Sequence, residues 1–262
     1  MNTVLITGAA GHIGRTLCAG LAEKGWRIRG IDLVEMPPEI DGRIADLASA
    51  DSARTLAEML DGCDALIHLA AVPEEDKWPK ILTANIDATH RVLESARLAG
   101  VRRVVYASSN HATGYTPRGG DPLPANAFPR PDTFYGVSKV ASEALCSLYA
   151  DRHGMRVVAL RIGTFAPVPP DERALATWLS PADMVALTHA ALTANIDGFR
   201  IVWGISDNSR AWWSPAAGES MGYHPRDDAE KFADNVLPST PEELAKVGGP
   251  FTLPKPGDGV RE

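Results

Sequence analysis

The sequence of 262 residues contains few cysteines and no long apolar run. Its three cysteines, Cys18, Cys63 and Cys146, are odd in number and show no CxxC spacing. This scatter excludes a disulfide framework and favours buried thiols in a reducing cytoplasm. No stretch reaches about 18 apolar residues, which excludes a membrane-spanning helix. The first residues lack a basic segment and their apolar run ends at Gly8, so we expect neither a signal peptide nor a membrane partner.

Clusters of positive charge are also missing. The net charge is −7, the isoelectric point is about 5.5, and no run of Lys or Arg occurs. Nucleic acid is therefore not an expected partner, because a phosphate backbone requires a basic surface. An acidic protein that acts on an anionic substrate needs a local Arg or Lys to offset its own field. The length, with 45% apolar and 23% charged residues, predicts one globular α/β unit with a small appended part.

Short apolar runs alternate with helical patterns along most of the chain. We expect strands at residues 4–6, 27–31, 43–45, 65–69, 103–107, 156–161 and 200–203. We expect helices at residues 12–24, 52–60, 81–99, 133–153 and 181–194. Strands that alternate with long helices predict a parallel sheet with helices on both faces.

Three glycines follow the first expected strand. Gly8, Gly11 and Gly14 form G-x-x-G-x-x-G at the start of the first helix. The first glycine permits a tight turn, the second lets the backbone approach a pyrophosphate, and the third lets helix and strand pack closely. The helix N-terminus then offers free N–H groups to the phosphates. This pattern predicts a dinucleotide site in a Rossmann-type doubly wound fold.

The domain organisation follows from where the alternation breaks. We assign residues 1–165 to the dinucleotide-binding Rossmann domain and residues 166–262 to a small C-terminal substrate-binding segment packed on it as one structural unit. This second part is rich in Trp, Pro and Gly. We interpret Trp203, Trp212 and Trp213 as packing residues rather than sugar-stacking residues.

A carboxylate at the end of the second strand indicates which dinucleotide binds. Asp32 is placed to accept hydrogen bonds from the ribose hydroxyls and to repel a 2′-phosphate, which favours NAD over NADP. Arg15 is a counter-signal, since a nearby Arg can hold that phosphate. Asp46 and Leu47, after the third strand, are expected near the adenine. An alternative role for Asp46 is to cap the helix that follows it.

A Tyr-Lys pair is the candidate catalytic centre. Tyr135 and Lys139 form Y-x-x-x-K at the start of a helix, and this spacing places both side chains on one face. A free Tyr is a poor base at neutral pH, and a neighbouring ammonium favours its phenolate. Such a pair takes the proton from a substrate hydroxyl during oxidation. Lys139 is also placed to hold the nicotinamide ribose. The alternative is a surface helix pair.

Polar residues at positions 108–111 follow the fifth strand. The carboxyl ends of strands face the ligand crevice in open α/β sheets, so one of these hydroxyls should polarise the substrate oxygen. We favour Ser109 for this role. Asn110 and His111 have the alternative role of turn residues.

Together these motifs resemble the extended short-chain dehydrogenase/reductase family, which includes the NAD-dependent epimerases and dehydratases. Longer segments narrow the resemblance to its uronate dehydrogenases, and it covers essentially the whole chain. These segments are ASSNHATGY (107–115), YGVSK (135–139), LRIGTFAPVPPDERALATWLSPADMVAL (160–187), IVWGISDNSRAWW (201–213) and GYHPRDDAE (222–230). The resemblance implies oxidation of D-galacturonate or D-glucuronate at C1 with NAD, giving an aldarolactone that opens to the aldaric acid.

The resemblance also implies a set of site residues. Tyr135 is then the base, Lys139 its partner, and Ser109 the hydroxyl that orients the substrate. The implied substrate contacts are Asn110, His111, Thr164, Arg173, which would clamp the carboxylate, and Phe251, which would close over the site. The implied cofactor contacts are Gly8, Gly11, His12, Ile13, Gly14, Asp32, Asp46, Leu47, Ala70, Ala71, Asn85, Tyr135, Lys139 and Ile162. No metal is implied, and relatives commonly form homo-oligomers.

One residue departs from the family pattern. Pro73 stands where the family can offer a Ser hydroxyl to the substrate, which puts one polar contact in doubt. Arg173 also has an alternative role, because Asp171 and Glu172 beside it allow a surface ion pair. Two other functions stay open at this stage: a nucleotide-sugar epimerase or dehydratase with tightly bound NAD, and a non-catalytic redox sensor on the same fold. The short C-terminal part argues against the former, and the intact Tyr-Lys pair against the latter.

Overall fold

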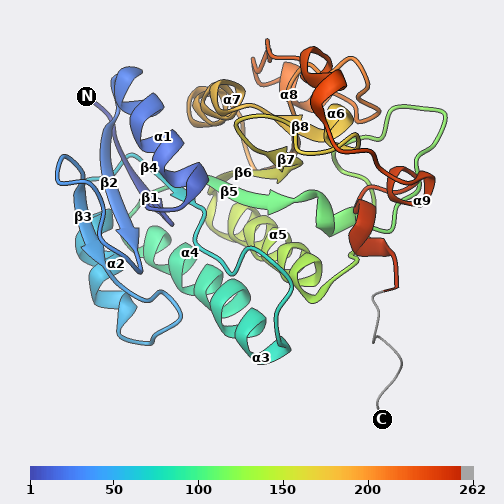
Figure 1. Cartoon of the computed structure of the whole chain (residues 1–262). Coiled ribbons are helices and arrows are strands. Elements are labelled where there is room, and N and C mark those ends of the chain that lie inside the picture. The colour runs from blue at the N-terminus through green and yellow to red at the C-terminus, as the bar shows by residue number, and fades with distance from the viewer. Residues whose placement is uncertain (255–262) are drawn as a thin grey trace.

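The computed structural model describes residues 1–254, and within them seven parallel strands form one sheet (Figure 1). The strands lie in the order β3-β2-β1-β4-β5-β6-β9. Their bounds are β1 Thr3–Thr7, β2 Arg27–Asp32, β3 Asp41–Ile44, β4 Ala65–His68, β5 Arg103–Ser109, β6 Arg156–Ile162 and β9 Phe199–Gly204. All neighbouring pairs are parallel, which confirms the predicted Rossmann-type fold.

Helices cover both faces of this sheet (Figure 1). On one face lie α1 (His12–Glu23) and α7 (Pro181–Thr193), which share an apolar core with the sheet. On the other face lie α2 (Ser52–Leu60), α4 (Ala88–Leu98) and α5 (Phe134–His153). The apolar strands explain this arrangement, because a strand with both sides buried needs a cover on each side. Every residue of β1 is buried.

The helix expected at residues 81–99 differs in detail. The chain forms α3 (Trp78–Ile81), then a π-helical stretch at Leu82–Asp87, and then α4. A π-turn widens the helix by one residue per turn and is frequent at functional sites. Here it buries Asn85, which is 1% exposed. The prediction of one regular α-helix was therefore wrong, and nothing in the apolar spacing signals the wider turn.

The C-terminal part consists mostly of short elements. These are β7 (Thr164–Phe165), α6 (Ala174–Thr177), β8 (Trp178–Leu179), α8 (Ala216–Glu219), α9 (Pro241–Leu244) and the 3₁₀ turns Ala229–Asn235 and Gly249–Thr252. Strands β7 and β8 pair in parallel, and β9 joins the edge of the main sheet. The division at residue 165 stays a prediction, and residues 255–262 of the assigned second part lie outside the described residues.

The tryptophans pack as expected. Trp203 and Trp213 are both 2% exposed and stack with ring centroids 4.3 Å apart. Trp203 donates from Nε1 to the Leu123 carbonyl at 3.0 Å. Trp212 lies edge-on to Trp213 and beneath the Arg118 guanidinium. Among residues 1–254, no helix has the length and apolar character required to cross a bilayer.

Candidate active site

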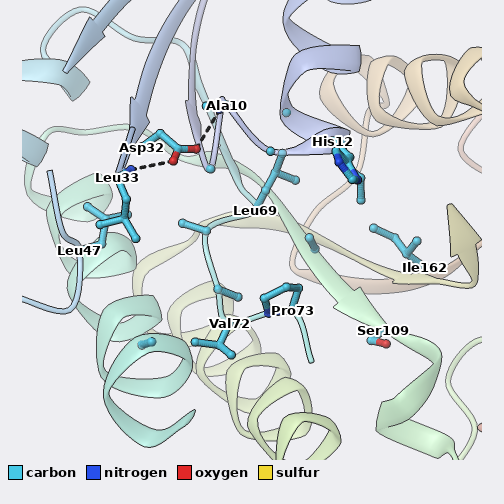
Figure 2. A pocket seen from close by; sticks show the side chains of 18 of the residues that line it. Ala10, His12, Asp32, Leu33, Leu47, Leu69, Val72, Pro73, Ser109 and Ile162 are labelled. Carbon is cyan, nitrogen blue, oxygen red and sulfur yellow. Dashed lines mark hydrogen bonds between the residues drawn. The ribbon is translucent and has the colours of Figure 1, made fainter. Parts of the chain in front are cut away.

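A cleft of about 690 Å³ runs along the carboxyl ends of β1, β2, β4, β5 and β6. Figure 2 shows it from Leu47 and Asp32 at one side to Ser109 and Ile162 at the other. The expected site residues that line it are Gly8, Gly11, His12, Ile13, Gly14, Asp32, Asp46, Leu47, Ala70, Ala71, Ser109, Asn110, His111, Tyr135, Lys139 and Ile162. The structure thus brings together residues that are far apart in the sequence.

The glycine loop at one end of the cleft has no room for a Cβ atom at Gly8 or Gly14. Gly8 has a φ of 74°, and a Cβ there would lie 2.8 Å from the Ala70 nitrogen. A Cβ on Gly14 would lie 2.1 Å from the Gly8 carbonyl oxygen. Gly11 is the N-cap residue of α1, and no side chain caps this helix terminus. The first-turn N–H groups therefore stand at the cleft wall, as a dinucleotide pyrophosphate requires.

Asp32 ends β2 at the rim of the same loop. Its Oδ2 accepts a hydrogen bond from the Ala10 nitrogen at 2.8 Å, and its Oδ1 accepts one from the Leu33 nitrogen at 2.7 Å (Figure 2). Oδ1 also accepts from the Val34 nitrogen at 3.4 Å, so Oδ2 is the oxygen that keeps a further lone pair. Asp46 also lines the cleft, and its Oδ1 accepts from the Ala48 nitrogen. The N-cap residue of α2 is Asp51, so the alternative role of Asp46 as a helix cap is wrong.

Asn85 lies behind the cleft wall rather than in it. Its Oδ1 accepts from the Val72 nitrogen at 2.8 Å, and its Nδ2 donates to the Val72 carbonyl at 3.1 Å and to Ser138 Oγ at 3.0 Å. Val72 lines the cleft. Asn85 therefore fastens the loop after β4 to α5, and Ser138 Oγ donates in turn to the Tyr135 carbonyl. In this structure the amide of Asn85 positions the lining without being part of it.

Tyr135 and Lys139 stand in the first two turns of α5, where both line the cleft. Thr133 is the N-cap residue, and its side chain accepts from the Gly136 nitrogen at 2.9 Å. The Lys139 ammonium donates to the Ala107 carbonyl at 2.7 Å and lies 5.3 Å from the centre of the Tyr135 ring. Because α5 begins at the cleft, the i, i+4 spacing directs both side chains to the end of β5.

Burial dominates the ionisation of this pair. It raises the pKa of Tyr135 to about 12, and a hydrogen bond with Ser109 partly offsets that rise. Burial also lowers the pKa of Lys139 to about 8, against an opposing effect of the Glu143 charge. The sequence predicted that a neighbouring ammonium favours the phenolate of Tyr135, but in this structure burial dominates and the pKa of Tyr135 is raised. The cost of desolvating a phenolate exceeds the attraction of an ammonium that is already bound to a carbonyl.

A buried ion pair lies behind the part of the cleft that holds Lys139. Arg161, 1% exposed, donates from Nε and Nη2 to the two oxygens of Glu143 at 2.9 and 2.8 Å. Ser108 Oγ donates to the same carboxylate at 2.5 Å. Glu143 lies one turn beyond Lys139 on α5, so its charge acts on the ammonium. Both Glu143 oxygens therefore accept hydrogen bonds, which is the condition under which a buried ion pair is tolerated.

The part of the cleft beyond β5 is built around a C-terminal segment. Asn110 Nδ2 donates to the Val247 carbonyl at 3.1 Å. The His111 ring lies edge-on to Phe251, with centroids 4.6 Å apart, and to Tyr135 at 5.9 Å. His111, Tyr135 and Phe251 also line a smaller cavity of about 30 Å³ beside the cleft. Pro73 lines both the main cleft and the small cavity. The serine hydroxyl that the family can offer at this position is therefore missing at the boundary between the two.

Two expected substrate contacts lie just outside the cleft lining. Thr164 shares a hydrogen bond with Thr177 Oγ1 at 2.9 Å, one residue from Gly163, which does line the cleft. Arg173 donates from Nη2 to the Val247 carbonyl at 2.5 Å, and its Nε is buried without a hydrogen-bond partner. Within residues 1–254 it forms no ion pair, so its alternative role as a surface ion pair is wrong.

Sequence reasoning missed several residues that shape the site. Asp132 accepts from His111 Nδ1, and Glu75 accepts from the Tyr135 nitrogen at 2.9 Å. Val247 contributes through its carbonyl, for which no sequence signal exists. Asp132 precedes the capping Thr133 and Tyr135 in the sequence, which is the one signal that points to it. Among residues 1–254, no group of acidic, His and Cys side chains is arranged to hold a metal ion.

The comparison with protein families decides the classification. Residues 4–182 match the model of the NAD dependent epimerase/dehydratase family. The chain belongs to this family. The expected resemblance to extended short-chain dehydrogenases is thereby confirmed.

Within the NAD dependent epimerase/dehydratase family, the chain is similar to uronate dehydrogenases over nearly its whole length. It is 39% identical over 264 residues to the uronate dehydrogenase of Pseudomonas putida, covering 97% of each chain. It is 37% identical to that of Pseudomonas syringae, covering 90% of this chain and 86% of the other. The solved structure of a uronate dehydrogenase variant from Agrobacterium tumefaciens, complexed with NAD, has a TM-score of 0.88 and 35% identity, covering 96% of this chain and 97% of the other.

Proposed function

We propose that this protein oxidises D-galacturonate or D-glucuronate at C1 with NAD, releasing an aldarolactone that opens to the aldaric acid. The observation that carries the proposal is the likeness to uronate dehydrogenases over nearly the whole chain. The family model alone ends at residue 182, whereas this likeness extends into the part that holds Val247 and Phe251. An oxidoreductase acting on a free sugar acid is therefore the function best supported.

The cleft fits the cofactor. Gly8, Gly11 and Gly14 leave space beside the free N–H groups of the α1 terminus, which we assign to the pyrophosphate, and we assign Asp32 to the ribose hydroxyls. The same carboxylate opposes a 2′-phosphate, which favours NAD. Bound NAD supplies the acceptor for the electron pair of the substrate C1–H bond. Lys139, near the far end of the cleft, is placed to hold the second ribose.

Residues at the end of β5 and the start of α5 are assigned to the transfer of the substrate hydroxyl proton. We assign Tyr135 as the base that takes the proton of the C1 hydroxyl, and Ser109 as the donor that orients the same oxygen. The raised pKa of Tyr135 means that the phenolate needs positive charge nearby when it forms. The Lys139 ammonium, held by the Ala107 carbonyl, supplies part of that charge.

The remaining substrate contacts would fix the rest of the sugar. We assign Asn110, His111 and Thr164 to sugar hydroxyls, Phe251 to the closing wall, and Arg173 to the carboxylate. An arginine with a buried, unpaired Nε has a donor in need of an acceptor, and a carboxylate satisfies a guanidinium in a bidentate manner. Arg173 does not line the cleft, so its Nη2 bond to the Val247 carbonyl would have to rearrange when a uronate binds.

The proposed function is tested by following NADH absorbance with a panel of free uronic acids, aldoses and nucleotide sugars. We expect net NADH from galacturonate or glucuronate and little from neutral aldoses. An epimerase or dehydratase that keeps its NAD bound gives no net NADH with any sugar. Absence of turnover with both uronates would overturn the proposal.

Two further properties remain proposals. We expect the protein to act in the cytoplasm, in keeping with its scattered free cysteines. We also expect a homo-oligomer, for which light scattering coupled to size-exclusion chromatography is the direct measurement.

A further inference from the structure

Asp132 has a buried carboxylate for which neither the cofactor nor the substrate accounts. Its side chain is 0% exposed, and it lies three residues before Tyr135 in the sequence. Both carboxylate oxygens contact His111 Nδ1, at 2.8 and 3.0 Å, and Oδ1 accepts a further hydrogen bond from Thr133 Oγ1 at 3.1 Å. A buried carboxylate is costly unless it is hydrogen-bonded, so these contacts explain how it persists.

Two glycines enclose this carboxylate. A Cβ on Gly114 would lie 2.0 Å from Asp132 Oδ2, and a Cβ on Gly248 would lie 1.8 Å from the same atom. The Gly248 nitrogen donates to the Gly114 carbonyl at 2.9 Å, which fixes the two backbones against each other. The chain therefore approaches Asp132 from two separate segments that cannot carry side chains there. This enclosure leaves the His111 ring as the principal side-chain partner of the carboxylate.

The contact dictates where the His111 ring carries its proton. An ionised carboxylate only accepts hydrogen bonds, so the facing Nδ1 must carry the hydrogen. In a neutral imidazole the other nitrogen, Nε2, then has a lone pair. Among the described residues Nε2 has no hydrogen-bond partner, and it is not sealed from solvent. His111 lines both the main cleft and the small cavity beside Phe251, so this acceptor belongs to the ligand space.

We propose that Asp132 is a positioning residue that fixes His111 as the Nδ1–H tautomer, so that Nε2 accepts a hydrogen bond from a substrate hydroxyl. This inference rests on the proposed function only for the identity of the ligand. A hydroxyl can donate a hydrogen bond to the Nε2 lone pair. An ionised carboxylate has no hydrogen to donate, so the lone pair disfavours it. His111 therefore directs the hydroxyl side of a sugar acid toward itself and its carboxylate elsewhere. The ring contacts with Tyr135 and Phe251 hold the imidazole plane for this purpose.

The tautomer is directly measurable in the unmodified protein. The experiment is ¹⁵N–¹H NMR of the histidine rings at about pH 8.5, above the ordinary histidine pKa of about 6.5, with His111→Gln used to assign the signal. We expect the Nδ1–H pattern for His111 in the wild type and a gain of the Nε2–H pattern in Asp132→Ala. A wild-type His111 in the Nε2–H form would overturn the proposal, and this holds even if Asp132→Ala does not fold.

Kinetics then separate positioning from support of the fold. We expect Asp132→Ala to raise the KM for galacturonate about tenfold, as loss of one aligned hydrogen bond does, with the Kd for NAD within twofold of wild type. Asp132→Asn keeps one acceptor oxygen for His111 Nδ1, so its KM for galacturonate should be close to that of the wild type. The matched control is Asp183→Ala, a buried carboxylate that accepts from the Arg226 and Asp227 nitrogens away from the cleft. It should lower the melting temperature without changing the KM.

The two proposals fail in different ways. If Asp132→Ala lowers only the melting temperature and leaves both KM and tautomer unchanged, Asp132 is structural and the inference is wrong. If the wild type oxidises no uronate but shows the Nδ1–H tautomer that Asp132→Ala removes, the proposed function fails and the role of Asp132 stands.

Discussion

Asn110 and Arg173 donate hydrogen bonds to the same atom, the Val247 carbonyl oxygen, at 3.1 and 2.5 Å. The two donors come from different parts of the fold, since Asn110 follows β5 and Arg173 precedes α6. A backbone carbonyl from the C-terminal segment thus joins two side chains that we assign to substrate. Val247 is itself fully buried, so this acceptor has a fixed position.

Replacing Arg173 tests its assignment to the uronate carboxylate. We expect Arg173→Ala to lower kcat/KM for galacturonate about 10- to 150-fold, the loss of a charge-assisted pair worth about 1.5–3 kcal/mol. The ratio of kcat/KM between galacturonate and the neutral sugar galactose should fall by about the same factor, while the Kd for NAD stays unchanged. Arg173→Lys keeps the positive charge but lacks the planar guanidinium, so its kcat/KM for galacturonate should lie between those of the wild type and Arg173→Ala. Equal losses for both sugars would make Arg173 structural.

Tyr135→Phe removes the hydroxyl that we assign as the base. The phenyl ring keeps the contact with His111, and the glycine loop and Asp32 that we assign to NAD are untouched, so the cofactor should still bind. We expect kcat to fall about 10²- to 10⁴-fold, as for loss of a positioned base. Steady-state kinetics and a fluorescence titration with NADH are the measurements. A loss of less than tenfold in kcat would remove Tyr135 from this role.

Lys139→Met is expected to change how stability depends on pH. Burial lowers the pKa of Lys139 from an unfolded value near 10.5 to about 8, so the unfolded chain binds the proton more tightly. The buried charge therefore destabilises the fold fully below about pH 8, and the penalty disappears as pH rises to about 10.5. This penalty in the wild type is about 3 kcal/mol. Lys139→Met removes it, but the variant also loses the hydrogen bond to the Ala107 carbonyl, which offsets part of the gain in stability.

Urea unfolding of wild type and Lys139→Met at a series of pH values measures this effect. The free energy of unfolding of the variant, relative to wild type, should fall by about 3 kcal/mol between pH 7 and 10.5. Lys24→Met, at an exposed lysine, is the control and should give a constant difference. A constant difference for Lys139→Met as well would contradict the lowered pKa.

Asp32→Ala addresses the choice of cofactor. We expect the KM for NAD to rise about tenfold or more, because a charged hydrogen-bond acceptor is lost. The ratio of kcat/KM for NAD to that for NADP should fall at least as much, because repulsion of the 2′-phosphate is lost too. Asp41→Asn, at the partly exposed carboxylate beside Arg29, should leave the ratio unchanged. Equal use of NAD and NADP by the wild type would contradict the assignment.

The parts of the site that sequence reasoning predicted are those with local causes. The glycines around the start of α1 serve a turn and close approaches within a few residues of themselves, so their spacing is visible in the sequence. The Tyr135–Lys139 spacing is likewise set by one helix. The parallel sheet with helices on both faces follows from the alternation of strands and helices, and the structure confirms it.

The parts that were missed depend on tertiary contacts. The π-turn that buries Asn85 has no signature in apolar spacing, because the widened turn keeps the same face buried. The Val247 carbonyl belongs to a backbone that folds back from far along the chain. The raised pKa of Tyr135 was not predicted, because it comes from burial, which a sequence does not display.

The arrangement of the sheet has a consequence for the nascent chain on the ribosome. By the time Ile162 has been made, the residues that we assign to NAD all exist, and six strands of the sheet can form. The α1 face of that sheet still lacks α7, whose side chains complete its core. Because N-terminal units fold first during synthesis, NAD capture by the growing chain would stabilise an unfinished protein. Such an intermediate would carry cofactor yet remain unable to recognise a sugar acid until Val247 and Phe251 emerge.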